Sequence, residues 1–155
     1  MSTPRVCAAL AGLALLVAAP VRAEDSVDGG VDTCAMDVVV SGLKDGGLVW
    51  ILVFSDAQAD AYPTKRDRAL KRLDVAPSGG TARAAFDGLE CREYAVAVVH
   101  DEDGNGKLDT NFIGIPREGL GASRDARRTF GPPRFEDAKV RLTRGRTRLP
   151  IAIVY

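Results

Sequence analysis

The sequence lacks an excess of charge of either sign, because its 21 basic residues balance 21 acidic ones. This balance excludes the basic footprint that a nucleic-acid-binding domain presents to phosphates. Apolar runs long enough to span a membrane are also missing. The longest run, residues 6–19, is shorter than a transmembrane helix requires. We therefore expect no nucleic-acid partner and, once the N-terminal segment is removed, no membrane span.

Residues 1–23 have the organisation of a secretory signal peptide. Arg5 precedes the apolar run, Pro20 ends it, and residues 21–23 (Val-Arg-Ala) form a small-residue cleavage site. No cysteine follows the run closely, which argues against a lipoprotein anchor. The alternative to a cleaved signal peptide is an N-terminal segment that is retained as an anchor. Cleavage would remove two arginines and leave a formal net charge of −2. We expect an exported protein, periplasmic or extracellular.

The mature chain is short enough to form one domain with a single core. Residues 24–34 are acidic and glycine-containing, which predicts a disordered segment before a domain spanning residues 35–155. Of the three cysteines, Cys7 leaves with the signal peptide. Cys34 and Cys91 remain, and in an oxidising compartment we expect them to form a disulfide. Two free buried thiols are the alternative.

The pattern of apolar residues predicts strands and no strong amphipathic helix. Residues 35–42 and 81–86 alternate with the period of a half-buried strand, and the sequence Asp87-Gly88 is expected to end the second. Residues 48–54 form a continuous apolar run, typical of a central strand covered on both faces. The 69–75 segment is ambiguous between helical and strand spacing, and we predict a strand.

Three further strands are expected at residues 94–100, 138–143 and 149–155, and Pro150 places the last of them near a sheet edge. Residues 55–67 are predicted to form a loop with one helical turn. Residues 110–133 form a long connection punctuated by glycine and proline. About seven short strands separated by turns predict an all-β fold, an antiparallel β-sandwich with one long loop.

An acidic loop follows the strand at residues 94–100. Asp101, Asp103 and Asn105 alternate, a glycine occupies the sixth place, and Lys107 and Asp109 follow, as in the first nine positions of a calcium-binding loop. The three alternating side chains, the backbone carbonyl of Lys107 and Asp109 can converge on Ca²⁺, which takes six to eight oxygens. An ordinary acidic turn is the alternative.

The match to the calcium loop ends at position twelve, where Phe112 replaces the bidentate glutamate. The loop also follows a strand rather than a helix, so the segment is not an EF-hand. Gly114 and Pro116 can fold the chain back, which makes Asn111 and Glu118 the candidates for the missing oxygen ligand. With the bidentate ligand in doubt, we expect weak affinity, as in extracellular calcium sites.

Five arginines make the long connection basic: Arg117, Arg124, Arg127, Arg128 and Arg134. Arg117, Arg127 and Arg128 are candidates for an anion- or carbohydrate-binding site beside the metal. The alternative is a solvated surface paired with the acidic loop.

The sequence has one histidine, His100, which would be the general base of a hydrolase with Ser55 or Ser123 as nucleophile. Nothing in the spacing of these residues supports that chemistry. We therefore do not expect an enzyme.

Residues 100–138, HDEDGNGKLDTNFIGIPREGLGASRDARRTFGPPRFEDA, resemble the signature of an exported bacterial family, domain of unknown function 2141. The resemblance extends over about residues 35–155. It implies a small β-sandwich similar to transthyretin-like or immunoglobulin-like domains, exported from the cytoplasm and without an established activity. Leu120 and Ala122 stand where that family tends to have aromatic residues, and residues 89–92 replace a usual Pro/Gly turn, which makes Cys91 a local staple.

The sequence thus predicts an exported β-sandwich that serves as a binding or assembly module, with a structural calcium-type loop. A carbohydrate- or anion-binding module is the second hypothesis, and a hydrolase is the third. The ligand or protein partner is not specified by the sequence.

Overall fold

A computed structural model of the chain describes residues 33–113, 116–129 and 131–155. The predicted signal peptide and residues 24–32 of the predicted disordered segment lie outside this range. No helix within the described residues has the length and apolar character needed to cross a bilayer.

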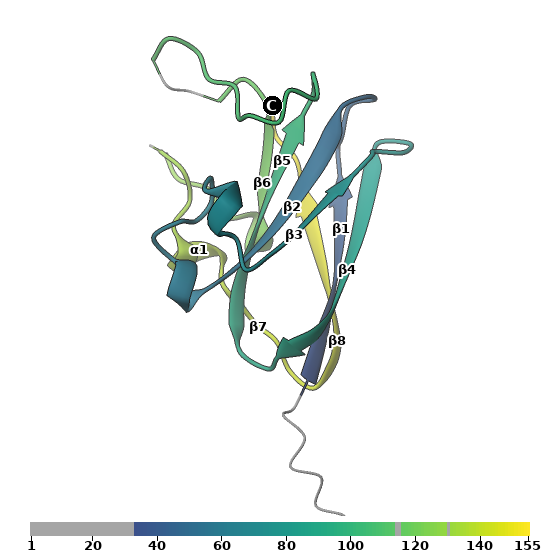
Figure 1. Cartoon of the computed structure of the whole chain (residues 1–155), viewed down its shortest axis with the longest axis vertical. Helices are drawn as coiled ribbons and strands as arrows, with labels where there is room; N and C mark the ends of the chain where they lie inside the picture. The colour runs from purple at the N-terminus through teal and green to yellow at the C-terminus, as the bar shows by residue number, and fades with distance from the viewer. Residues whose placement is uncertain (1–32, 114–115, 130) are drawn as a thin grey trace, which may run out of the picture.

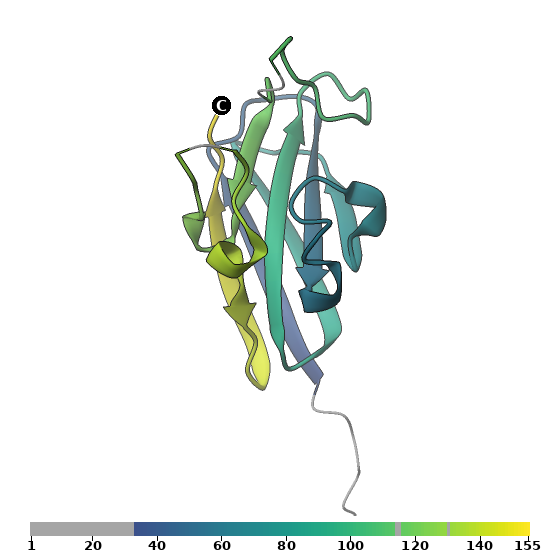
Figure 2. The same ribbon diagram turned by 90° about the vertical axis from the view of Figure 1, so that its left-hand side faces the viewer.

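Eight strands in the described residues form two facing sheets, which confirms the predicted all-β sandwich (Figures 1 and 2). The smaller sheet has the order β4-β1-β8, and the larger has the order β3-β2-β5-β6, with β7 also paired to β5. The strands are β1 (Thr33–Ser41), β2 (Leu48–Ser55), β3 (Lys71–Val75), β4 (Thr81–Glu90), β5 (Glu93–Asp101), β6 (Gly119–Ala122), β7 (Val140–Arg141) and β8 (Gly145–Ala152).

The core between the sheets follows from the strand periods. On β1, every second residue from Cys34 to Val40 is buried, which is the expected pattern for a strand with one face toward the core. Strand β2 is buried on both faces, as its continuous apolar run predicted. Its alternate side chains Val49, Ile51 and Val53 enter the inter-sheet core, and the others pack on the opposite face of the larger sheet.

That opposite face is covered by short helical turns and their connections. These are η1 (Asp56–Gln58), η2 (Arg66–Arg68) and α1 (Phe135–Ala138). The Tyr62 ring packs edge-on against Phe54 from β2 and Phe135 from α1, with centroids 5.4 and 6.2 Å apart. The helical turn expected in residues 55–67 is present. The four residues of α1 were not predicted, because one turn leaves no periodic pattern to detect.

Strands β1 and β4 extend beyond their predicted bounds. Strand β1 begins at Thr33, so the prediction of disorder is wrong for Thr33 and Cys34. Strand β4 does not end at Gly88 but continues to Glu90. The register shifts between Cys34 and Met36 of β1, opposite Leu89 and Phe86 of β4. Gly88 has φ of 66°, so the sequence Asp87-Gly88 forms a β-bulge rather than a turn.

The last third of the chain departs most from the predicted strands. Within residues 138–143 only the two residues of β7 are in strand. Strand β8 starts at Gly145, before the predicted residue 149, and pairs in parallel with β1, whereas the other strand pairs of the described residues are antiparallel. Pro150 lies in β8 at an edge of its sheet, as predicted. The long connection contains β6, which was not predicted.

The segment after β8 crosses from the smaller sheet to the larger one and pairs there with β6. The backbone N–H groups of Leu120 and Val154 each donate to the other residue's carbonyl, with N···O distances of 2.9 Å. Gly119 permits this crossing, because a Cβ atom there would lie 2.6 Å from the Tyr155 ring. One open side of the sandwich is thereby closed.

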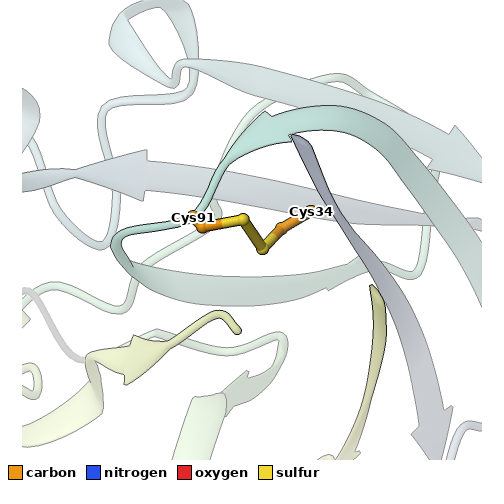
Figure 3. Close-up of a disulfide and its surroundings, with 2 residues drawn as sticks. All are labelled: Cys34 and Cys91. Carbon is orange, nitrogen blue, oxygen red and sulfur yellow. A yellow bond between two sulfur atoms is a disulfide. The ribbon is translucent and has the colours of Figure 1, made fainter. Parts of the chain in front are cut away.

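The predicted disulfide between Cys34 and Cys91 is present, with Cα atoms 5.2 Å apart (Figure 3). Cys34 is near the start of β1, and Cys91 lies in the turn between β4 and β5. The crosslink therefore ties the two sheets together at the corner where the chain passes from one to the other.

Candidate metal centre

The acidic loop begins where β5 ends, at Asp101, whose side chain is buried. Its carboxylate accepts hydrogen bonds from the backbone N–H groups of Asn105 (3.1 Å) and Gly106 (2.9 Å). Gly106 has φ of 75°, a conformation that glycine adopts without strain. These bonds coil the chain around the Asp101 carboxylate, as the sixth-position glycine of a calcium loop does.

Asn105 is oriented differently from the sequence prediction. Its side-chain NH₂ group donates to Asp103 (2.9 Å) and to Asp109 (3.1 Å), while its Oδ1 accepts from the backbone N–H of Lys107 (2.7 Å). The amide nitrogen therefore faces the carboxylates, where a metal ligand must present oxygen. Asn105 can serve as a ligand only after its amide turns over.

The chain then turns back on itself, and we call its described residues 109–113 and 116–117 the finger. Thr110 and Pro116 form an antiparallel bridge, and the backbone N–H of Arg117 donates to the Asp109 carbonyl (2.9 Å). The side chain of Asn111 stays within the finger and accepts from the backbone N–H of Ile113. Because the finger closes on itself, the next residue, Glu118, returns to the acidic loop.

Oxygens of Asp101, Asp103 and Glu118 lie within 4.8 Å of one another. Glu118 is buried, with only 6% of the residue exposed. Its Oε2 accepts from the backbone N–H of Asp109 (3.3 Å). Its Oε1 is also buried and has no hydrogen-bond partner among the described residues.

Burial raises the pKa of the Glu118 carboxyl to about 7, and the neighbouring carboxylates of Asp101, Asp109 and Asp103 add to the rise. Desolvation and like charges both disfavour the ionised form. A bound cation would reverse this balance by neutralising the cluster and by giving Oε1 a partner.

A cavity of about 270 Å³ opens beside the cluster. Arg117 lines it, together with Lys44, Glu102, Asp103, Asp109 and Glu118. Arg127 and Arg128 are not among the lining residues and follow η3 (Ser123–Asp125) in the chain. The structure thus brings one of the three predicted anion-binding arginines to the acidic cluster.

His100 is fully buried and holds the end of β5 in place. Its Nε2–H donates to the Gly46 carbonyl (2.8 Å), which fixes the tautomer, so Nδ1 accepts from the Tyr155 hydroxyl (2.6 Å). The hydroxyl in turn accepts from the backbone N–H of Lys44 (2.8 Å). Sequence reasoning missed this network, because its members are 54 and 55 residues from His100.

Neither candidate nucleophile is bonded to His100. Ser55 donates to Gln58 (2.8 Å), and Ser123 bonds the backbone of Val96 and Ala138. The structure therefore does not assemble the predicted serine–histidine pair.

The family model described as "Uncharacterized protein conserved in bacteria (DUF2141)" matches residues 38–149. The chain belongs to this family. The match covers β5, the acidic loop, the finger and Glu118, so the candidate centre lies within the DUF2141 domain. No curated protein and no solved structure matches the chain.

Proposed function

We propose that this DUF2141 domain is an exported binding module whose acidic loop holds a structural calcium ion. One observation carries the proposal: Glu118 Oε1 is buried, has no hydrogen-bond partner among the described residues, and belongs to a cluster of three carboxylates. Buried polar atoms are nearly always hydrogen-bonded, and a buried charge is stable only when it is paired or bound to a metal.

Calcium fits the donor set better than a transition metal does. The cluster offers carboxylate oxygens, with the Lys107 carbonyl and Asp109 nearby in sequence, and no thiolate or imidazole. Glu118 supplies the carboxylate that Phe112 cannot supply at position twelve of the loop. It arrives from the returning arm of the finger, so a strand-based loop can complete the ligand set that an EF-hand takes from its second helix.

In this role the metal would link Asp101, the last residue of β5, and Asp103, on the coil that follows, to Glu118, just before β6. It would hold both arms of the finger and relieve the repulsion among the carboxylates. The ion would therefore order the binding surface without taking part in a reaction, and we propose binding without turnover.

An anion-binding role is the second candidate, and Arg117 is the residue that favours it. Arg117 lines the cavity beside Asp103 and Glu118. A metal and a guanidinium on one cavity form a site for a carboxylate or phosphate group. Arg127 and Arg128 do not line this cavity, so they are not part of the proposed anion site.

Export to the periplasm or beyond is part of the proposal. The Cys34–Cys91 disulfide supports it, because such crosslinks persist mainly in oxidising compartments.

The proposal is tested by calorimetric titration of the mature protein with calcium chloride, accompanied by thermal melting with calcium or with chelator. At a hundredfold excess over its dissociation constant, calcium should stabilise the native state by roughly 2.7 kcal/mol. Asp103→Asn and Glu118→Gln should each weaken binding and reduce the stabilisation.

Asp45→Asn is the matched control, because Asp45 is exposed in the turn between β1 and β2 and is not part of the cluster. It removes the same charge and should leave calcium binding unchanged. Absence of binding heat and of a melting shift in the unmodified protein would refute the metal site. If Asp45→Asn and Asp103→Asn lost calcium affinity equally, the binding would reflect the net charge of the protein rather than a specific site.

A further inference from the structure

The tip of the finger exposes two consecutive large apolar side chains. Phe112 is 98% exposed and Ile113 is 64% exposed, more than any other large hydrophobic residue of the described chain. Apolar residues scattered singly over a surface need no explanation. Here they are adjacent and lie between Thr110 and Pro116, which pair with each other.

The finger is anchored to the acidic cluster at its base. The Thr110–Pro116 bridge and the bond from Arg117 to Asp109 close it, and Glu118 follows directly. In Figures 1 and 2 the described residues of the connection from β5 to β6 reach beyond the end of the sandwich, at the opposite end from the start of β1, which carries Cys34 of the disulfide. The apolar tip, the cluster of three carboxylates and the cavity lined by Arg117 thus share one end of the molecule.

We propose that this end attaches to anionic phospholipid membranes in a calcium-dependent manner. Phe112 and Ile113 enter the interfacial layer of the bilayer, and a lipid phosphate binds in the cavity between the metal and Arg117. This inference rests on the proposed calcium site and names the partner of that site.

The size of the apolar tip favours a membrane over a protein partner. Two side chains are far from the roughly 800 Å² per partner that a stable protein interface buries. Shallow insertion into a bilayer needs only apolar side chains at a projecting tip. One such anchor is marginal by itself, and stable attachment requires a second, electrostatic contribution.

The charges around the finger make that second contribution depend on the cation. Five acidic residues surround the base, Asp101, Glu102, Asp103, Asp109 and Glu118, against the three basic residues Lys44, Lys107 and Arg117. Without a metal this end repels an anionic surface. A bound calcium ion neutralises part of the cluster and can take a phosphate oxygen as a further ligand, while the guanidinium of Arg117 binds the same group.

Co-sedimentation with vesicles tests the inference. The mature protein is mixed with phosphatidylglycerol–phosphatidylethanolamine vesicles, or with phosphatidylcholine vesicles, in calcium or in chelator. It should bind the anionic vesicles in calcium and be released by chelator. The double variant Phe112→Ser/Ile113→Ser should lose about tenfold or more in vesicle affinity, because burial of each side chain contributes to binding. Its calorimetric calcium affinity in solution should not change.

Leu70→Ser is the matched control for the apolar tip. Leu70 is 43% exposed, and its N–H bonds the Val53 carbonyl, in the half of β2 away from the acidic loop. This variant should bind vesicles as the unmodified protein does. Arg117→Gln should weaken vesicle binding and retain calcium. Inorganic phosphate should compete only weakly, because it lacks the bilayer that the apolar tip enters.

The outcomes separate this inference from the proposed function. If calcium does not bind in solution, both fail. Calcium binding without vesicle binding would overturn only the membrane attachment and would assign the tip to a protein partner. Vesicle binding that is unchanged in Phe112→Ser/Ile113→Ser, or in chelator, would also overturn it. Full competition by inorganic phosphate would reduce the site to a free-phosphate site.

Discussion

The two ends of β5 are stabilised in different ways. Near Glu93, where the strand begins, the Cys34–Cys91 disulfide joins the first strand to the turn that precedes β5. At Asp101, where it ends, carboxylates gather around backbone N–H donors, and one buried oxygen, Glu118 Oε1, has no partner among the described residues. The first end is fixed by a covalent bond, whereas the proposed calcium site would make the stability of the second depend on the calcium concentration.

The two ends therefore contribute differently to the free energy of unfolding: one contribution is independent of calcium, and the other is proposed to depend on it. The crosslink restricts the unfolded chain at any pH and at any calcium concentration as long as it is oxidised. At the acidic end, desolvation and neighbouring carboxylates disfavour the ionised form of Glu118, and we propose that a bound calcium ion offsets this cost. If so, the two ends should respond independently, and each can be tested alone.

Removal of the disulfide should have the largest effect. The bridge spans 57 residues, and loss of that closed loop is expected to lower the free energy of unfolding by about 4 kcal/mol. Cys34→Ala/Cys91→Ala can be compared with the unmodified protein by urea unfolding, followed through the fluorescence of Trp50, the only tryptophan. The stabilisation by calcium should persist in the variant. Its disappearance would mean that the two ends are not independent.

Ionisation of Glu118 should produce the next largest effect, in chelator. In the unfolded chain the group ionises near its ordinary pKa of 4.5, whereas in the folded chain it keeps its proton until about pH 7. The folded state therefore loses stability relative to the unfolded state as the pH rises between these values. Glutamine cannot ionise, so Glu118→Gln should become the more stable protein by on the order of 3 kcal/mol above pH 7.

Calcium should reverse this order, because Glu118 is then a ligand and the variant lacks it. The measurement is urea unfolding of both proteins across the pH range, in chelator and in calcium. Parallel stability curves in chelator would show that the Glu118 carboxyl is not held in an unfavourable environment.

Local patterns explain how much of the fold the sequence predicts. The alternation in β4 and the continuous apolar run in β2 are set by neighbours along the chain, so both strands were predictable. The four residues of β6 include two glycines and carry no apolar period. Its strand conformation comes from pairing with β5 and with Val154. The parallel pairing of β1 with β8 joins residues as distant as Cys34 and Gly145, and no local signal encodes it.

The same distinction applies to the candidate site. Asp101, Asp103 and Asp109 are close in sequence, so their spacing alone indicated an oxygen-rich coil. Glu118 was accessible to prediction because glycine and proline between it and the coil allow the chain to return. Composition does not indicate where a side chain lies in the fold. Arg127 and Arg128 were therefore grouped with Arg117, although of the three only Arg117 lines the cavity.

The network that holds His100 should contribute less than either of the first two features. Tyr155→Phe removes the hydroxyl that donates to His100 Nδ1 and leaves a buried acceptor unpaired. We expect a loss of about 1.5 kcal/mol in the free energy of unfolding. Calcium affinity should fall as well, because His100 precedes Asp101 and fixes the end of β5. A stability loss with unchanged calcium affinity would show that the network does not position the acidic loop.

The smallest effect is expected at the rim of the acidic end. Lys44 Nζ lies 3.0 Å from Glu102 and 3.8 Å from the centre of the Tyr155 ring, and its side chain is 55% exposed. Lys44→Met keeps most of the stem and removes the charge, so the free energy of unfolding should fall by only about 0.5 kcal/mol. Added salt should shrink the difference further, because it screens exposed pairs. A loss several times larger, measured by urea unfolding in chelator, would make Lys44 a counter-charge of the carboxylate cluster and would weaken the argument that this end requires a metal.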